Sequence, residues 1–173
     1  MALALSIALI IMGCAQKTEI AKSKIVVESV FENGGYIPAK YTCQGENINP
    51  PIYLKNLSPK AESIAIIVED IDAPKGIFTH WIIYNIPPVN EIPEGIQRGK
   101  FIETPFKAVQ GENDFGFYGY GGPCPPYGTH RYYFKVYVLD TKLEWKVYKK
   151  DELMKRMEGH IIQYGELMGK FSK

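Results

Sequence analysis

Reactive side chains stand at the ends of three apolar segments of this chain. Asp70 and Asp72 directly follow the first segment, and His80 and His130 each begin a later one. A neutral imidazole donates or accepts a hydrogen bond, and a protonated imidazole attracts an anion. A neighbouring carboxylate orients the ring and favours its charged form. This combination indicates a small anion-binding pocket.

A glycine-rich segment offers a second means of holding an anion. Residues 118–123 read Tyr-Gly-Tyr-Gly-Gly-Pro. Glycine has no Cβ atom, so the backbone can approach a ligand closely. Consecutive N–H groups in such a loop can form a concave anion site. Gly121 and Gly122 are the candidates for this role.

Each of these residues also has a purely structural interpretation. Asp70 and Asp72 can stabilise the turn that leads into Pro74, because aspartate bonds readily to nearby backbone. The two histidines can be satisfied side chains at the edge of a core, and Tyr132 can simply pack. Spacing alone leaves both interpretations open.

Short apolar runs separated by turn residues predict that strands position these groups. The predicted strands cover residues 25–30, 52–54, 63–69, 80–86 and 130–140, and a long loop covers residues 111–129. One helix follows, with Asp151 as its cap and Gly159 interrupting or ending it. Its apolar stripe consists of Leu153, Met154, Met157 and, at its far end, Ile161. The pattern therefore predicts a mostly antiparallel β structure with one late helix.

Alternation along a strand assigns the side chains to faces. His130 and Tyr132 should share a face with Phe134, Val136 and Val138. Arg131 should face the other way and form a structural ion pair. The earlier strand should also have two faces. We expect one face to carry His80, Ile82 and Tyr84, and the opposite face to carry Trp81, Ile83 and Asn85. His160, near the helix end, is expected to contact backbone carbonyls there.

Length and composition narrow the function. The 173 residues fit one domain, and no repeat or linker divides it. The net charge of +1 argues against a nucleic-acid partner, because such partners need a basic face. No Gly-x-Ser-x-Gly nucleophile motif occurs, and the three histidines form no compact metal-ligand motif. We therefore expect no catalysis, no metal and no cofactor.

The first residues read as an export signal. Residues 1–13 are uncharged, mostly apolar and too few to span a bilayer. They lead into Ile-Met-Gly-Cys14, which resembles the lipobox of secreted lipoproteins. We expect residues 1–14 to be a signal segment, lipidation at Cys14, residues 15–24 to be a polar tether and residues 25–173 to be the domain. The protein would then be anchored outside the cell membrane.

Alternatives to this reading remain open. No Lys or Arg precedes the apolar run, which departs from the usual signal and leaves open a start farther upstream. The run can instead be a disordered tail with a free Cys14, and the protein can be secreted or cytoplasmic. In an exported protein, Cys43 and Cys124 could form a disulfide. Two buried free thiols are the alternative.

Several ordered motifs resemble the phosphatidylethanolamine-binding protein family, and most closely its prokaryotic, Raf-kinase-inhibitor-like branch. The motifs are Asp70-Ile71-Asp72-Ala73-Pro74, His80-Trp81, Gly122-Pro123, and Gly128-x-His130-Arg131-Tyr132. Residues 42–51, Gly121–Pro126 and Gly159-His160 match patterns of the prokaryotic branch. The likeness extends from about residue 25 to the last residue, and Ile71 departs from it, since many relatives have proline there.

The resemblance implies a fold and a site. The fold would be a large antiparallel sheet packed on a smaller one, with a helix near the C-terminus. The pocket would take phosphate, a phospholipid head group or a similar anion, with side chains of Asp70, Asp72, His80, His130 and Tyr132 and backbone of residues 119–122. Pro74 would shape the pocket after a peptide bond that is often cis in the family. Relatives in this branch often pair, so a homodimer is possible.

Two function classes follow. The first is non-catalytic binding of an anionic ligand, with binding that weakens as the pH rises through about 6–7, where histidine loses its charge. The second is inhibition of a serine protease or a kinase through residues 111–129, a loop stiffened by Pro123, Pro125 and Pro126. In the second case pocket substitutions would be silent.

Overall fold

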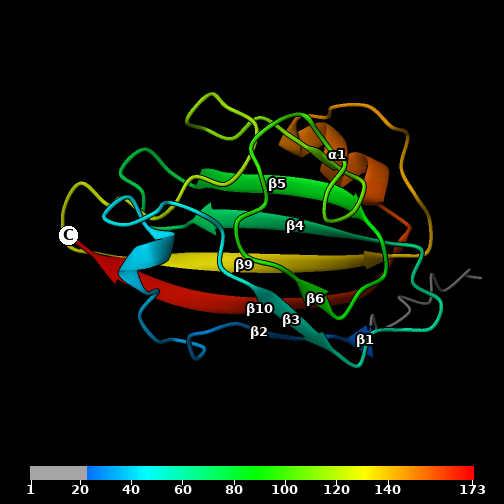
Figure 1. The fold of residues 1–173 in the computed structure, drawn as a ribbon, viewed down its shortest axis with the longest axis horizontal. Coiled ribbons are helices and arrows are strands. Elements are labelled where there is room, and N and C mark those ends of the chain that lie inside the picture. Colours follow the sequence, from blue (N-terminus) through cyan, green and yellow to red (C-terminus); the bar gives the residue numbers. More distant parts are fainter. Residues whose placement is uncertain (1–22) are drawn as a thin grey trace, which may run out of the picture.

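The computed structural model describes residues 23–173, which form two packed β-sheets and one helix (Figure 1). The larger sheet has seven strands in the order β1-β10-β9-β4-β5-β8-β7, and the smaller has the order β2-β3-β6. The elements are β1 (Ser23–Lys24), β2 (Val26–Glu28), β3 (Ile52–Lys55), β4 (Ser63–Asp70), β5 (Phe78–Ile86), β6 (Glu91–Ile92), β7 (Phe101–Ile102), β8 (Ala108–Gln110), β9 (Thr129–Leu139), α1 (Lys150–Met157) and β10 (Ile161–Ser172). A 3₁₀ turn covers Ala39–Tyr41. The predicted mostly β class with two packed sheets and a short helix is confirmed.

The centre of the large sheet is buried on both faces. Every residue of β4 is buried, which matches its nearly continuous apolar sequence. One face packs against the small sheet and forms the main core, which includes Ile66, Trp81 and Phe134. The other face is covered by α1, where Ile67, Tyr84 and Leu153 form a second core. The sheet is thus a rigid platform for whatever lies at its strand ends.

An extra residue in β5 changes the side to which His80 points. Val68 pairs with Trp81, but Glu69 pairs with Thr79, so one residue of β5 is left over in a β-bulge. Thr79 lies on the helix side, where its Oγ1 accepts a hydrogen bond from Lys150. His80 instead contacts Tyr132 on the main-core side. The predicted face of His80 is therefore wrong.

A second register shift lies between Ile64 and Ile66, opposite the end of β5. It accompanies a positive φ at Asn85, whose side chain bonds to the backbone of Leu143, a residue packed on the helix-side core. Asn85 therefore does not share the face of Trp81 and Ile83, as alternation predicted. Alternation holds for β9, where His130, Tyr132 and the three apolar residues after them are all buried toward the main core.

The helix differs in detail from the prediction. Its N-cap is Lys149, without a side-chain cap hydrogen bond. Asp151 lies in the first turn instead, where a carboxylate is favoured by the helix dipole. Ile161 belongs to β10 rather than to the helical stripe. The ring of His160 contacts the carboxylate of Asp140 at 2.9 Å, not backbone carbonyls.

A buried ion cluster ties α1 to the sheet. The Glu69 carboxylate accepts hydrogen bonds from Lys135 at 2.6 Å and from Lys150 at 2.8 Å. Burial opposes ionisation of Glu69, but the two ammonium groups outweigh it and lower its pKa. The cluster lies on the opposite face of the sheet from His80.

The strand β10 is the largest element that the sequence pattern missed. It pairs along its length with β9 and begins directly after the helix, so the helix is not the last element. Gly165 and Gly169 interrupt its apolar pattern, because a Cβ atom at either position would overlap Ile25 or Ile37. Ser23 and Lys24 pair with β10 in parallel, so the last two residues of the predicted tether belong to the domain.

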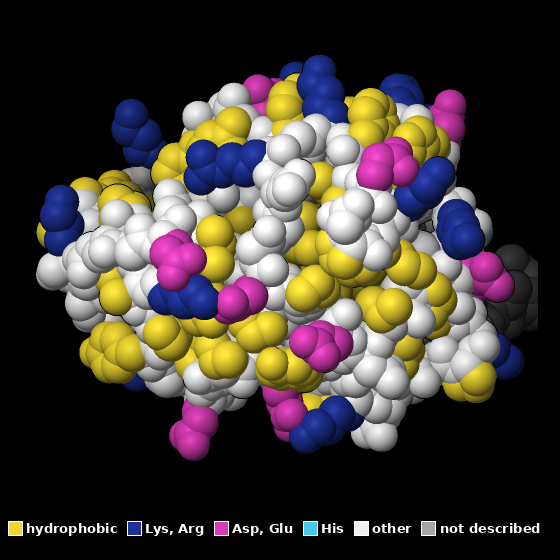
Figure 2. Space-filling model, viewed as in Figure 1, with side chains coloured by type: hydrophobic (Ala, Val, Ile, Leu, Met, Phe, Trp, Pro, Cys, Tyr) yellow, Lys and Arg dark blue, Asp and Glu magenta, His cyan; other side chains and the backbone are white. Residues whose placement is uncertain are grey.

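Figure 2 shows one face of the molecule, on which Lys and Arg side chains alternate with Asp and Glu side chains. No wide area of one charge is visible on that face. The distribution agrees with the near-zero net charge of the chain.

Candidate functional site

Asp70, His80 and His130 come from three neighbouring strands and line one cavity. They lie at the end of β4, near the start of β5 and at the start of β9, which are adjacent in the sheet. The cavity has a volume of about 330 Å³. The rest of its wall is formed by Ala73, Pro74, Lys75, Gly76, Ile77, Phe78, Phe115, Cys124 and Pro126. The structure thus brings together three of the predicted polar side chains.

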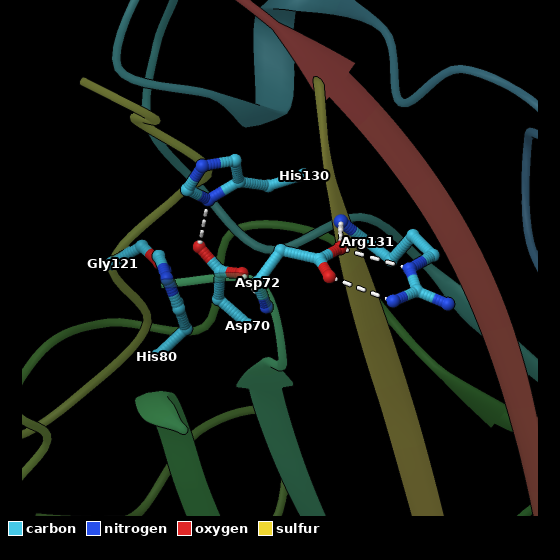
Figure 3. Close-up of polar contacts among 6 residues, drawn as sticks. All are labelled: Asp70, Asp72, His80, Gly121, His130 and Arg131. Carbon is cyan, nitrogen blue, oxygen red and sulfur yellow. Dashed lines mark hydrogen bonds and ion pairs between the residues drawn. The ribbon is translucent and has the colours of Figure 1, made fainter. Parts of the chain in front are cut away.

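His130 is oriented by Asp70 (Figure 3). Its Nδ1 lies 2.7 Å from Oδ2 of Asp70, and both side chains are at least 95% buried. The other carboxylate oxygen of Asp70 accepts a hydrogen bond from the backbone N–H of Asp72 at 2.9 Å. Asp70 is therefore fixed on both oxygens, and it in turn fixes the ring of His130.

His80 is oriented by backbone. Its Nδ1 lies 2.6 Å from the carbonyl oxygen of Gly121, and Figure 3 shows the two residues next to each other. A carbonyl oxygen only accepts hydrogen bonds, so the proton resides on Nδ1. The rings of Phe78, Phe115 and Tyr132 surround the imidazole edge to face. Burial lowers the pKa of His80 and keeps the ring neutral at neutral pH.

Gly121 and Gly122 do not offer their N–H groups to a ligand. The N–H of Gly121 donates to the carbonyl oxygen of His80, and the N–H of Gly122 donates to the side chain of Asn47. The predicted anion-binding role of these two amides is therefore wrong. Both glycines are needed for close packing, since a Cβ atom would lie 2.5 Å from Phe115 or from the backbone of Tyr41.

Asp72 faces away from the cavity. Its carboxylate accepts two hydrogen bonds from the guanidinium of Arg131, at 2.7 and 2.8 Å, and one from the Arg131 backbone (Figure 3). The hydrogen bonds from Arg131 lower the pKa of Asp72. The predicted ion pair of Arg131 is present, but Asp72 does not line the cavity as a ligand-binding residue.

Tyr132 lies behind the two histidines and does not line the cavity. Its ring is 5.2 Å from that of His80, measured between centroids. Its hydroxyl is the one fully buried side-chain polar atom within residues 23–173 that has no hydrogen-bond partner. Burial raises the pKa of this hydroxyl, so it stays protonated. Tyr132 therefore supports the histidine rings from the core side.

Pro74 lines the cavity, but the bond before it is not cis. In the described part of the chain the cis peptide is Thr104–Pro105. The cis bond that the resemblance implied before Pro74 is therefore not found there. Ala73, Pro74 and the residues after them still form one side of the cavity mouth.

The sequence analysis did not predict most of the apolar residues that line the cavity, nor Lys75. Lys75 is the only Lys or Arg among the residues that line the cavity. Ile77 and Phe115 are about half exposed at its rim. These residues lie in loops without strand periodicity, so only their nearness in sequence to Asp70 and Gly121 could have indicated them.

A disulfide closes another side of the cavity. Cys43 and Cys124 are bonded, with their Cα atoms 5.4 Å apart, and Cys124 lines the cavity. Both residues are exposed, unlike the buried thiols of the alternative prediction. The bond ties the loop before β9 to the segment after the 3₁₀ turn. Cys14, the signal segment and most of the predicted tether lie outside the described residues.

The other features within residues 23–173 have fewer groups that could bind a ligand. A larger groove of about 660 Å³ runs beside β10 and α1, but its charged residues are only Lys24 and Glu166. No group of three metal-ligating side chains occurs within residues 23–173. The helix in that range is too short and too polar to cross a membrane.

Comparisons with known sequences show the family. Residues 27–172 match the family described as phosphatidylethanolamine-binding protein. The UPF0098 protein of Archaeoglobus fulgidus is 53% identical over 169 residues, which are 98% of this chain and 58% of that relative. The UPF0098 protein of Pyrococcus horikoshii is 54% identical over 165 residues, which are 94% of this chain and 83% of that relative.

Comparisons with solved structures identify the same family. A phosphatidylethanolamine-binding protein homolog from Chlamydia trachomatis matches with a TM-score of 0.79 and 42% identity, over 87% of this chain and 99% of the other. Escherichia coli YbcL, described as a member of the mammalian PEBP family, matches with a TM-score of 0.78 and 29% identity, over the same shares of the two chains. The chain belongs to the phosphatidylethanolamine-binding protein family. Its UPF0098 relatives place it among the prokaryotic members.

Proposed function

We propose that this chain is a non-catalytic binding protein whose cavity takes a phosphate-bearing or similar anionic ligand. The observation that carries the proposal is the state of the two imidazoles. Each ring is held through Nδ1, by Asp70 or by Gly121. Neither Nε2 atom has a partner or is fully buried within the described chain. Both are therefore available to a ligand.

The charges around the cavity support a small anion. Lys75 contributes a positive charge at the mouth. A protonated His130 neutralises Asp70, and its Nε2–H can then donate to a ligand oxygen. The apolar side chains around these groups strengthen such a hydrogen bond by excluding water.

The absence of catalysis is part of the proposal. In an Asp–His hydrolase the histidine activates a nucleophile, and the carboxylate orients the histidine. Here no Ser, Thr or Cys side chain within residues 23–173 hydrogen-bonds to the ring of His80 or His130. The arrangement supports holding an anion rather than transforming it.

The test is calorimetric titration of the full chain with phosphoethanolamine at about pH 6. The parent should bind saturably. A His80→Ala, His130→Ala double variant should not bind, although circular dichroism shows it folded. His160→Ala, which changes an exposed histidine outside the cavity, is the matched control and should bind like the parent. A folded parent that binds no phosphate compound would overturn the proposal.

A second candidate function is inhibition of a serine protease or kinase by the loop before β9. Tyr127 is 66% exposed in this loop, and the disulfide at Cys124 restrains it. A restrained loop with an exposed side chain is suited to insertion into a partner. Inhibition that is lost in Tyr127→Ala but kept in the double histidine variant would favour this function.

The exposed disulfide also supports export, because such bonds persist in oxidising compartments. We also propose that Cys14 carries a lipid anchor, because the residues before it, Ile-Met-Gly, resemble a lipobox. Mass spectrometry of the protein from membrane fractions would detect the added lipid, and an unmodified Cys14 would contradict the anchor.

A further inference from the structure

The two histidines are held by chemically different partners, a carbonyl oxygen for His80 and a carboxylate for His130. The Nδ1 proton of His80 is held by the Gly121 carbonyl oxygen, so the Nε2 of the neutral ring carries only a lone pair and accepts. His130 faces a carboxylate through Nδ1. A carboxylate in this position can compensate the charge of a ring that carries a proton on both nitrogens, and such a ring offers Nε2–H as a donor.

The surroundings of His80 oppose a second proton on its ring. Three aromatic rings enclose it, and it is 3% exposed. The charged and titratable groups around it are Asp70 on β4, Tyr132 and His130 on β9, Asp114 in the loop before β9 and Lys75 at the cavity mouth. Burial lowers the pKa of His80 and outweighs the hydrogen bond to the Gly121 carbonyl oxygen and the two carboxylates, which favour protonation of the ring.

Asp70 adds a second constraint. Its carboxylate is 95% buried and lines the same cavity. Asp70 and a protonated His130 together carry no net charge, so the pair does not compensate a second negative charge on a ligand, and water screens that charge poorly in the cavity. A ligand with one negative charge and one O–H group avoids this uncompensated charge and also satisfies His80.

We infer that the cavity selects oxyacid groups that keep one acidic proton, such as the monoanion of a phosphate monoester or a phosphonate. It rejects oxyanions without a proton, such as sulfates and sulfonates. The P–O–H group of the ligand donates to Nε2 of His80, and an unprotonated oxygen accepts from Nε2–H of His130. This inference rests on the proposed function and specifies its ligand.

Methylphosphonate and methanesulfonate test the inference directly. At about pH 6 both are small tetrahedral monoanions of the same shape, and only the phosphonate carries an O–H group. Leaving a buried acceptor without a donor weakens binding by about tenfold or more. Calorimetric titration of the full chain should show methylphosphonate binding at least about tenfold more tightly than methanesulfonate. Equal affinity would overturn the inference and leave the proposed function standing.

Variants separate this selection from a merely structural role. In His80→Gln the amide can offer either its oxygen or its N–H₂ group, so the preference for phosphonate should fall to about threefold or less. In Asp70→Asn the negative charge of Asp70 is removed, so the dianion should bind more tightly relative to the monoanion. His160→Gln is the control and should keep the preference of the parent. A preference that survives unchanged in the folded His80 and Asp70 variants would also overturn the inference.

The pH dependence distinguishes the proton of the ligand from those of the protein. Affinity for methylphosphonate should fall as the pH rises through the second pKa of the ligand. The midpoint should move to lower pH with phosphoethanolamine, whose second pKa is lower. A midpoint that stays fixed for both ligands would assign the titration to the protein and contradict the inference. If a folded parent binds neither compound, both the proposed function and the inference are overturned.

Discussion

His80 and Gly121 are joined in both directions. Nδ1 of His80 donates to the Gly121 carbonyl oxygen at 2.6 Å, and the N–H of Gly121 donates to the His80 carbonyl oxygen at 2.9 Å. The ring and the loop before β9 therefore hold each other in place. Changes in the glycine loop should alter the histidine, even though the loop offers no N–H group from these glycines to a ligand.

Substituting the two glycines should have unequal effects. A Cβ atom on Gly121 would meet the ring of Phe115, which is 44% exposed and can rotate away. A Cβ atom on Gly122 would meet the backbone oxygen of Tyr41, which cannot. We expect Gly122→Ala to lower the free energy of unfolding by about 1–3 kcal/mol and Gly121→Ala by less. Urea unfolding of both variants checks the order, and a larger loss in Gly121→Ala would contradict it.

The contributions of Asp70 and His130 to the stability of the fold should be strongly coupled. Removing one member of a buried, hydrogen-bonded pair leaves the other without a partner, at a cost of about 3–5 kcal/mol. Asp70→Ala and His130→Ala should each destabilise the fold, and the double variant should lose clearly less than the sum of the two. A double-mutant cycle by chemical denaturation measures this coupling. Additive losses would show that the contact at 2.7 Å contributes little to stability.

His80 should make the unliganded protein less stable in mild acid. Its folded-state pKa is lowered by burial from an ordinary value of 6.5. The unfolded chain therefore takes up a proton first as the pH falls, so stability is complete above about 6.5 and declines below it. His80→Phe should reduce the decline between about pH 7 and about pH 5.

The control for this measurement is His160→Phe, whose ring is half exposed beside Asp140. It should leave the His80 part of the decline unchanged. The buried Glu69 does not interfere, because its lowered pKa places its loss of charge below the ordinary value of 4.5. Identical pH profiles for the parent and His80→Phe would mean that His80 takes up its proton equally well in the folded and unfolded chains.

The disulfide should contribute substantially to stability. It joins residues 81 positions apart, and closing a loop of this size in the unfolded chain corresponds to about 4 kcal/mol. A Cys43→Ser, Cys124→Ser variant should lose stability of that order in guanidinium unfolding. Both proteins should carry Cys14→Ser, so that the third thiol cannot exchange. Equal midpoints with and without the bond would contradict this prediction.

The sequence anticipated the strands that reach the cavity because their signals are local. Residues 63–69 and 130–140 are continuous or alternating apolar runs, and β4 and β9 lie there within one residue at each end. The bulge at His80 was not predictable in this way. It arises from the pairing of β5 with β4, which a single strand does not encode in its own period.

The direction of Asp72 was missed for a related reason. Alternation would place Asp70 and Asp72 on one face, but β4 ends at Asp70. Beyond that residue the turn, not the strand, sets the direction, and Arg131 on β9 takes up the carboxylate. The cavity wall from Lys75 to Phe115 likewise depends on loop contacts that no periodic pattern reports.

The pairing of β1 with β10 has a consequence for how the protein is made. Ser23 and Lys24 pair with Gln163 and Tyr164, and β10 also completes the sheet beside β9. During translation β10 leaves the ribosome after the other elements of residues 23–173. The growing chain therefore cannot close its main sheet, or place β9 with His130 between two neighbouring strands, until β10 has been made.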